Sequence, residues 1–133
     1  MRVVLDTNVF VSGIFWKGNF CSRIIEKWKE KRFNLASSME VIKELINTLS
    51  DFKIQMPKEM VNEWSNLIIE NSIIVGPTIK IDAIKEDPKD NKFLEAAITG
   101  NADLIISQDK HLLKLKEYEK IKIVKPEDAI LML

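Results

Sequence analysis

The segment Asp103-Leu-Ile-Ile-Ser-Gln-Asp109 carries the clearest strand signal in the sequence. Its central residues, Leu104 to Ile106, are apolar without a polar interruption, so we predict a strand over 103–107. A strand that is apolar on both faces is typical of a parallel sheet covered by helices on its two sides. The segment therefore predicts an α/β fold, and it predicts that Asp109 lies just beyond a strand end.

Four other short apolar runs are predicted strands, and helical patterns lie between most of them. The predicted strands are Arg2–Leu5, Phe33–Ala36, Ile73–Val75 and Ile121–Val124. A helix over about 20–31 is predicted to be capped by Asn19, and a helix over 37–49 is predicted to begin with a Ser37–Glu40 capping box. A third helix begins at Pro57, and a fourth covers 87–99 and ends before Gly100. Two short helices are predicted over 110–115 and 126–131. Thr7–Gly18, with two glycines, is predicted to be a loop. This alternation favours a parallel sheet sandwiched between helices.

Length and composition fit one globular domain over residues 1–133 and exclude several other classes. Hydrophobic residues make up 46% of the chain, which is enough for a core, and the formal net charge is zero. The overall charge therefore gives no sign of nucleic-acid binding. A single cysteine excludes an internal disulfide, and no stretch resembles a signal peptide or could span a bilayer. We expect a cytoplasmic protein without a membrane anchor.

Acidic residues stand where the predicted strands and helices end. Asp6 directly follows the first strand, and Asp109 follows the 103–107 strand by two residues. Asp87 and Asp90 lie in the first turn of the helix that feeds that strand. Because ligand sites of parallel sheets lie outside the carboxyl ends of the strands, these acids are expected to meet. Clustered carboxylates repel one another unless a cation neutralises them, and oxygen ligands alone favour Mg²⁺ or Mn²⁺.

Each acid also has a structural interpretation. Asp87 fits a helix N-cap, Asp90 can interact with the helix dipole, and Asp109 can cap the short helix that follows it. Glu44 lies in the 37–49 helix, where glutamates are commonly solvated. Asp6 is the hardest to explain structurally, since it ends an apolar strand. Taken jointly, the positions favour a metal site.

Four short motifs carry a family resemblance. Asp6-Thr-Asn-Val resembles the opening motif of the PIN-domain nucleases, and the Glu44 helix entered by Ser37-Ser38 resembles their second motif. Asp87-Pro-Lys-Asp90-Asn-Lys-Phe-Leu-Glu-Ala-Ala resembles the third, and Ser107-Gln-Asp109-Lys-His-Leu-Leu resembles the fourth. The last two motifs are most similar to those of the toxin components of toxin–antitoxin pairs.

The resemblance implies a three-layer α/β/α sandwich with a mainly parallel central sheet. It also implies a catalytic and metal-binding set with Asp6 and Asp90 as direct ligands, and with Glu44 and Asp109 completing the metal site or acting through waters. Asp87 would substitute for or assist Asp90, and Asn8 and Ser107 would orient ligands or water. The acidic set is Asp6, Glu44, Asp90 and Asp109. The implied activity is Mg²⁺- or Mn²⁺-dependent hydrolysis of single-stranded RNA, in a homodimer with an antitoxin protein as partner.

Two other interpretations stay open from the sequence. A PIN-like module can bind RNA or a protein partner without cutting it. An aspartate-dependent phosphatase also places an acid after its first strand, but it uses a second acid two residues later, where this chain has Asn8.

Overall fold

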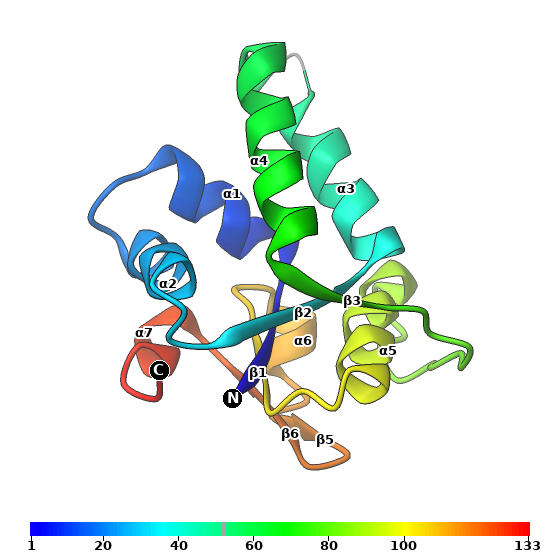
Figure 1. Ribbon diagram of the computed structural model, residues 1–133. Helices are drawn as coiled ribbons and strands as arrows, with labels where there is room; N and C mark the ends of the chain where they lie inside the picture. The colour runs from blue at the N-terminus through cyan, green and yellow to red at the C-terminus, as the bar shows by residue number, and fades with distance from the viewer. Residues whose placement is uncertain (52) are drawn as a thin grey trace.

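The protein is built around one central sheet, shown in Figure 1 as a computed structural model that describes residues 1–51 and 53–133. The strand order in this part of the chain is β3-β2-β1-β4-β6-β5, and all neighbours are parallel except β5 with β6. The strands are β1 (Arg2–Leu5), β2 (Asn34–Ser38), β3 (Ser72–Val75), β4 (Leu104–Ile106), β5 (Glu117–Tyr118) and β6 (Ile121–Val124). The predicted mainly parallel sheet is confirmed.

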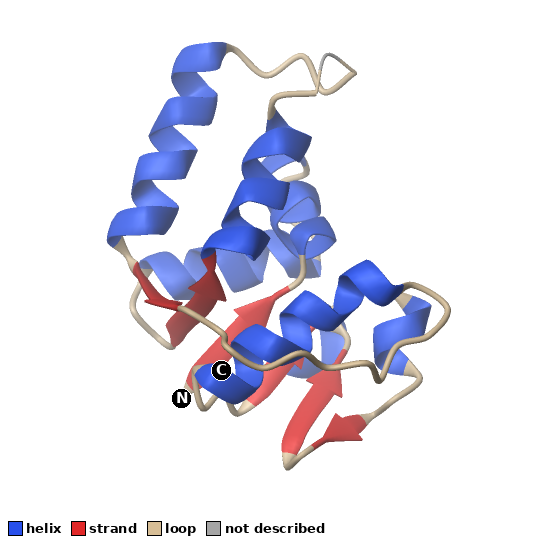
Figure 2. Ribbon diagram, turned by 90° about the vertical axis from the view of Figure 1, so that its right-hand side faces the viewer, coloured by secondary structure: helices blue, strands red, loops and turns tan. Residues whose placement is uncertain are grey.

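Helices cover both faces of the sheet, and the antiparallel pair α3 and α4 rises beyond its edge (Figures 1 and 2). The helices are α1 (Thr7–Phe15), α2 (Phe20–Lys29), α3 (Met39–Leu49), α4 (Lys58–Glu70), α5 (Asn91–Thr99), α6 (Lys110–Leu113) and α7 (Pro126–Ala129), with a 3-10 turn η1 (Pro88–Asp90). The predicted three-layer α/β/α architecture is therefore confirmed. No helix of the described residues is long and apolar enough to cross a membrane.

Strand β1 divides its side chains between two apolar clusters. Val3 and Leu5 pack in the cluster formed with α1 to α4 and α7, whereas Val4 packs in the cluster formed with α5 and α6. All three are at most 1% exposed. Alternate strand side chains point to opposite faces, and full burial of each stabilises the fold by about 1.5 to 3 kcal/mol. This two-sided burial fixes the position at which Asp6 leaves the sheet.

The parallel pairing of β1 with β4 brings the first and fourth motifs together. Leu5 is in register with Ile106, and the Asp6 backbone N–H donates to the Ile106 carbonyl at 3.0 Å. Since both strands run in the same direction, Asp6 and Ser107 emerge at the same edge of the sheet.

Residues 7–15 form helix α1, so the prediction of a loop over 7–18 is wrong for most of its length. Val9 and Phe10 are buried, and the Phe10 ring packs edge-on against Trp28 with centroids 5.9 Å apart. The two glycines have different roles. Gly18 adopts a φ of +87° and makes the turn, whereas Gly13 lies inside the helix.

Gly13 lies where helix α1 packs tightly against helix α2. A Cβ atom at this position would lie 2.7 Å from Ile25 Cγ1 and 2.8 Å from the Cys21 carbonyl oxygen. We predict that Gly13→Ala lowers the free energy of unfolding by about 2 kcal/mol, because the clash outweighs the gain of about 1 kcal/mol in helix propensity. Urea unfolding measures this, with Gly76→Ala as the control, since no atom lies within 4 Å of a Cβ there. Unchanged or higher stability of Gly13→Ala would contradict the packing role.

Of the caps predicted for α2 and α3, the first is confirmed and the second is shifted by one residue. Asn19 caps α2 as predicted, because its side chain accepts from the Ser22 N–H at 2.8 Å. The cap of α3 is Ser38 and not Ser37, since Ser38 accepts from the Val41 N–H at 3.3 Å. The predicted Ser37–Glu40 capping box is therefore wrong. Strand β2 continues through both serines because they pair with β3.

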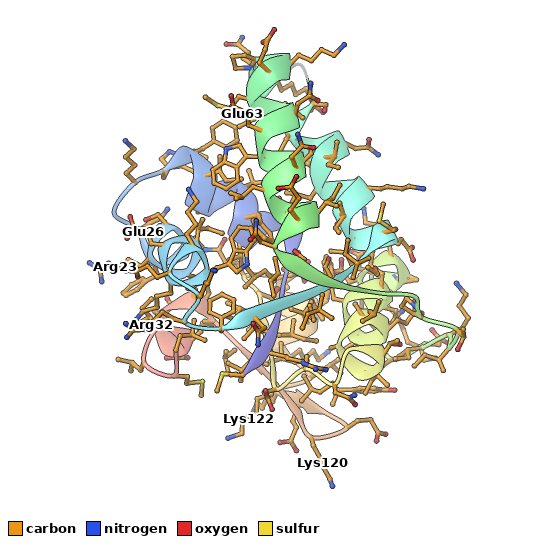
Figure 3. All side chains as sticks on the ribbon, in the orientation of Figure 1. Arg23, Glu26, Arg32, Glu63, Lys120 and Lys122 are labelled. Carbon is orange, nitrogen blue, oxygen red and sulfur yellow. The ribbon has the colours of Figure 1, made fainter. Side chains whose placement is uncertain are left out.

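The hairpin of β5 and β6 was not predicted. Its turn residues, Glu119 and Lys120, have φ values of +49° and +74°. Turns of this kind usually contain glycine or asparagine, so this hairpin lacks the ordinary sequence signal. Charged side chains of both signs, including Lys120 and Lys122, point outward from separate parts of the surface (Figure 3). The labelled charges do not gather into one basic face.

Candidate metal centre

Ser107 joins the first and fourth motifs through its side chain. It is fully buried, and its Oγ donates to Asp6 Oδ2 at 2.6 Å. The same Oγ accepts from the Asp109 backbone N–H at 2.9 Å. Ser107 therefore holds the backbone of Asp109 against the carboxylate of Asp6, which is itself only 4% exposed.

Asp109 has both of the roles that the sequence left open. It is the N-cap of α6, where its Oδ1 accepts from the His111 N–H at 2.7 Å. Its carboxylate also lies with those of Asp87 and Asp90, and one oxygen of each lies within 4.8 Å of the others. Capping of α6 thus holds Asp109 next to the other two acids.

Asp87 occupies the position before η1 but its side chain makes no capping hydrogen bond. The prediction that Asp87 serves as the N-cap is therefore right for its position and wrong for its side chain. The carboxylate joins Asp90 and Asp109 instead.

Asp90 is the acid of this pocket whose negative charge is least compensated by neighbouring groups. Its Oδ2 is buried and has no hydrogen-bond partner among the described residues. Burial raises the pKa of Asp90 to about 7, with further contributions from a hydrogen bond with Asp109 and from repulsion by Asp109, Asp87 and Asp6. A partnerless buried carboxylate oxygen is costly unless a cation or a proton compensates it.

Asp6 shows the same tendency. Burial raises the pKa of Asp6, while hydrogen bonds from Ser107 and from the Asn8 backbone oppose the rise, and repulsion from Asp109 and Glu44 adds to it. Asp6 is thus coupled electrostatically to the other acids across the edge of the sheet.

These acids line one pocket of about 210 Å³ at the carboxyl ends of β1 and β4. Its lining residues are Asp6, Thr7, Asn8, Glu44, Thr48, Asp87, Lys89, Asp90 and Asp109. All of the sequence-predicted acids therefore meet, and exposed Asn8 lies beside them. The donors are carboxylate and hydroxyl oxygens, which suit a hard cation such as Mg²⁺ or Mn²⁺. The partnerless oxygen of Asp90 leaves one buried donor free for such an ion, so the donor set is compatible with a divalent cation.

Glu44 lines the pocket but already has partners. Its Oε1 forms an ion pair with Lys92 Nζ at 2.8 Å, and its Oε2 accepts from the Thr7 hydroxyl. This ion pair was not predicted from the sequence. Lys92 falls outside the apolar stripe of its helix, yet only 7% of its side chain is exposed.

The remaining polar residues of α5 position the segment that leads into the pocket. Asn91 Oδ1 accepts from the Ala83 and Ile84 backbone N–H groups at 3.1 and 2.9 Å. Glu95 Oε2 accepts from the Ile81 N–H at 3.0 Å. These contacts hold the extended segment before Asp87 against α5, and they were not predicted.

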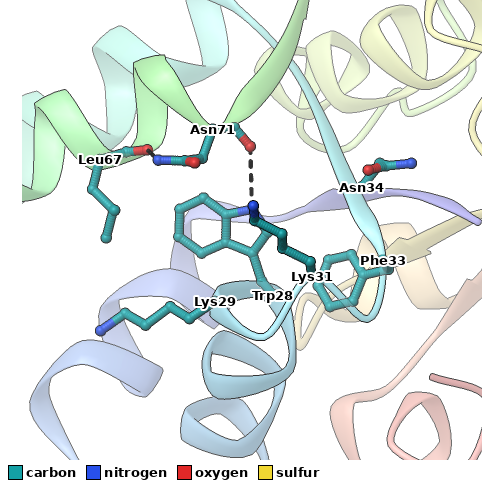
Figure 4. Close-up of a pocket in the computed structure, with 7 residues that line it drawn as sticks. All are labelled: Trp28, Lys29, Lys31, Phe33, Asn34, Leu67 and Asn71. Carbon is teal, nitrogen blue, oxygen red and sulfur yellow. Dashed lines mark hydrogen bonds between the residues drawn. The ribbon is translucent and has the colours of Figure 1, made fainter.

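A larger hollow of about 560 Å³ lies at the opposite ends of the strands, between α2 and α4 (Figure 4). Its lining residues are Trp28, Lys29, Lys31, Phe33, Asn34, Leu67 and Asn71. The Trp28 indole N–H donates to the Asn71 carbonyl at 3.3 Å across this hollow. No carboxylate lines it, so its size does not make it a metal site.

Removal of the Ser107 hydroxyl tests its bridging role. We predict that Ser107→Ala weakens Mn²⁺ binding by about tenfold, because residues that orient metal-binding carboxylates typically contribute this much. Isothermal titration calorimetry measures the change. Ser65→Ala, which removes a hydroxyl bonded to a carbonyl on α4, is the control. Equal Mn²⁺ affinity of the Ser107→Ala and wild-type proteins would contradict the bridging role.

The fold and the pocket together define an α/β protein with an acidic site at the carboxyl edge of its parallel sheet. The sequence matches the family model of the PIN domain over residues 2–111, so the chain belongs to the PIN-domain family. It is 30% identical over 128 residues to an uncharacterized protein of Methanocaldococcus jannaschii, covering 90% of this chain and 78% of the relative.

Two solved structures share the fold. One is from VapBC-1 of nontypeable Haemophilus influenzae, with a TM-score of 0.65, 17% identity and coverage of 96% of this chain and 99% of the other. The other is from VapBC2 of Rickettsia felis bound to a DNA fragment from its promoter, with a TM-score of 0.58, 17% identity and coverage of 94% and 98%. At this identity the likeness shows the fold alone.

Proposed function

We propose that the protein is a Mg²⁺- or Mn²⁺-dependent endoribonuclease that hydrolyses phosphodiester bonds of single-stranded RNA. The observation that carries this proposal is the partnerless buried oxygen of Asp90 beside Asp87 and Asp109. Membership in the PIN-domain family supports the nuclease activity.

The metal would be held by Asp6, Asp90 and Asp109, with Asp87 assisting. A bound divalent ion supplies a nucleophile by lowering the pKa of water and neutralises charge on the phosphate. Ser107 holds Asp6 and Asp109 in place through its hydroxyl. Asn8, exposed beside the carboxylates, is placed to orient water or substrate.

We further propose that the protein is the cytoplasmic toxin of a toxin–antitoxin pair and forms a homodimer. Its third and fourth motifs resemble those of toxin components, and both similar solved folds come from VapBC complexes. Exposed apolar side chains, Trp16 at 62% and Leu131 at 86%, offer surface for contacts with an antitoxin or a second copy.

A cleavage assay tests the activity. The purified protein is incubated with labelled single-stranded RNA and with DNA of the same sequence, in Mg²⁺, Mn²⁺ or EDTA. We expect RNA cleavage with either metal and none with EDTA. Cleavage that persists in EDTA would contradict the proposal. RNA binding without cleavage would favour a binding module, and release of phosphate from a monoester without strand cutting would favour a phosphatase.

A further inference from the structure

The ion pair between Glu44 and Lys92 separates one acid of the pocket from the others. Lys92 Nζ lies 2.8 Å from Glu44 Oε1 and also donates to the Lys89 carbonyl at 3.0 Å. A buried ammonium is stable only when it is paired, and Glu44 is its ionic partner. The pair therefore belongs to the folded structure and is not an accidental surface contact.

Both carboxylate oxygens of Glu44 are occupied by the protein itself. The Lys92 ammonium donates to Oε1, and the Thr7 hydroxyl donates to Oε2. These contacts link α3 with α5 and with the first turn of α1 at the wall of the pocket. Asp90, in contrast, has an oxygen without any partner in the described chain. The Glu44 side of the pocket thus has a buried cation paired with it, whereas the described residues provide no such pair for the buried oxygen of Asp90.

We infer that Lys92 is a positioning residue that keeps Glu44 out of the metal ligand set, so that the pocket takes a single divalent ion on the side of Asp6, Asp90 and Asp109. A second divalent ion near Glu44 would be repelled by the buried Lys92 ammonium, which lies 2.8 Å from Glu44 Oε1. This inference rests on the proposed metal-dependent function and replaces the expectation that Glu44 is a ligand.

A charge-matched double variant provides the test. Glu44→Gln alone would leave the buried Lys92 ammonium without its ionic partner, and the uncompensated positive charge would weaken metal binding whether or not Glu44 is a ligand. Glu44→Gln combined with Lys92→Met removes both charges and leaves the net charge of the site unchanged. Calorimetric titration with Mn²⁺ measures the number of ions per chain and the Kd, and circular dichroism checks the fold.

We expect one Mn²⁺ per chain for the wild type and for the double variant, with Kd values that agree within about threefold. Asp90→Asn should weaken Mn²⁺ binding by about thirtyfold or more. Two ions on the wild type, or a folded double variant with at least about tenfold weaker binding, would overturn the inference. Absence of any Mn²⁺ binding to the wild type would overturn the proposed metal-dependent function as well. A failure of the inference about Lys92 alone can therefore be distinguished from a failure of the proposed function.

The single variant Lys92→Met keeps the test decisive if the double variant does not fold. Removal of a positive charge beside the site should tighten Mn²⁺ binding by about threefold or more, since the freed Glu44 charge then attracts the ion. Unchanged or weaker binding by folded Lys92→Met would contradict the role given to Lys92.

Discussion

Asp90→Asn is expected to reduce metal-dependent RNA cleavage by about a hundredfold to a thousandfold. Asp90 is the acid whose buried Oδ2 has no partner among the described residues, so it has the most to gain from a bound cation. The substitution keeps the shape of the side chain and removes its charge. The loss should therefore reflect the metal site and not a change in fold.

Initial cleavage rates at several Mn²⁺ concentrations measure this effect. The matched control is Asp82→Asn, because Asp82 is 76% exposed and its ion pair with Lys85 lies on the surface. Its cleavage rate should stay within about twofold of the wild type. If Asp90→Asn cleaves as fast as Asp82→Asn, the assignment of Asp90 to the metal site is wrong.

The same substitution is expected to stabilise the protein when metal is removed. Folding raises the pKa of Asp90 from 3.8 to about 7, so the folded state binds more protons than the unfolded state between these values. The free energy of unfolding therefore falls as the pH rises from about 4 to about 7, and the penalty is complete above pH 7. Asn at this position cannot ionise and avoids the penalty.

At pH 8 in EDTA, Asp90→Asn should be more stable than the wild type by about 2 kcal/mol, about half of the unscreened value, because the pocket is open to water. This corresponds to a rise in Tm of about 6 to 10 °C for a domain of this size. The difference should shrink to a few tenths of a kcal/mol near pH 4, where Asp90 is protonated in the folded state and only about half ionised in the unfolded state. Thermal unfolding across this pH range measures it. An Asp90→Asn protein that is less stable at pH 8 would contradict the repulsion described for this pocket.

The sheet could be predicted from the sequence because its strands are short apolar runs with clear ends. The run before Asp6 and the run before Ser107 are buried on both faces, and the parallel-sheet rule then places the acids that follow them at one edge. The gathering of the acids followed from this local pattern together with one topological rule.

The errors occur where the deciding contact lies elsewhere in the chain. Gly13 suggests a loop when only its neighbours in sequence are considered, but it is required by the backbone of α2 at Cys21. The hairpin at Glu119 and Lys120 forms without glycine, because pairing with β6 imposes the left-handed conformation. Neither contact can be inferred from the hydrophobic periodicity of a single segment.

Lys92 shows the same limit within the candidate site. In the helical pattern of α5 it falls beside the apolar stripe, and a lysine there is ordinarily solvated. Its burial depends on Glu44, which is 48 residues earlier in the chain and on another helix. Such a pair is visible only once α3 and α5 are placed together.

The position of a bound metal ion would show whether this acidic pocket is a metal site. Crystals grown with MnCl₂ and measured near the manganese absorption edge would show each ion as an anomalous density peak. We predict one peak per chain, within coordination distance of Asp6, Asp90 or Asp109 carboxylate oxygens and with the Glu44–Lys92 pair intact. Absence of a peak from this pocket, at a Mn²⁺ concentration that supports cleavage, would contradict this prediction.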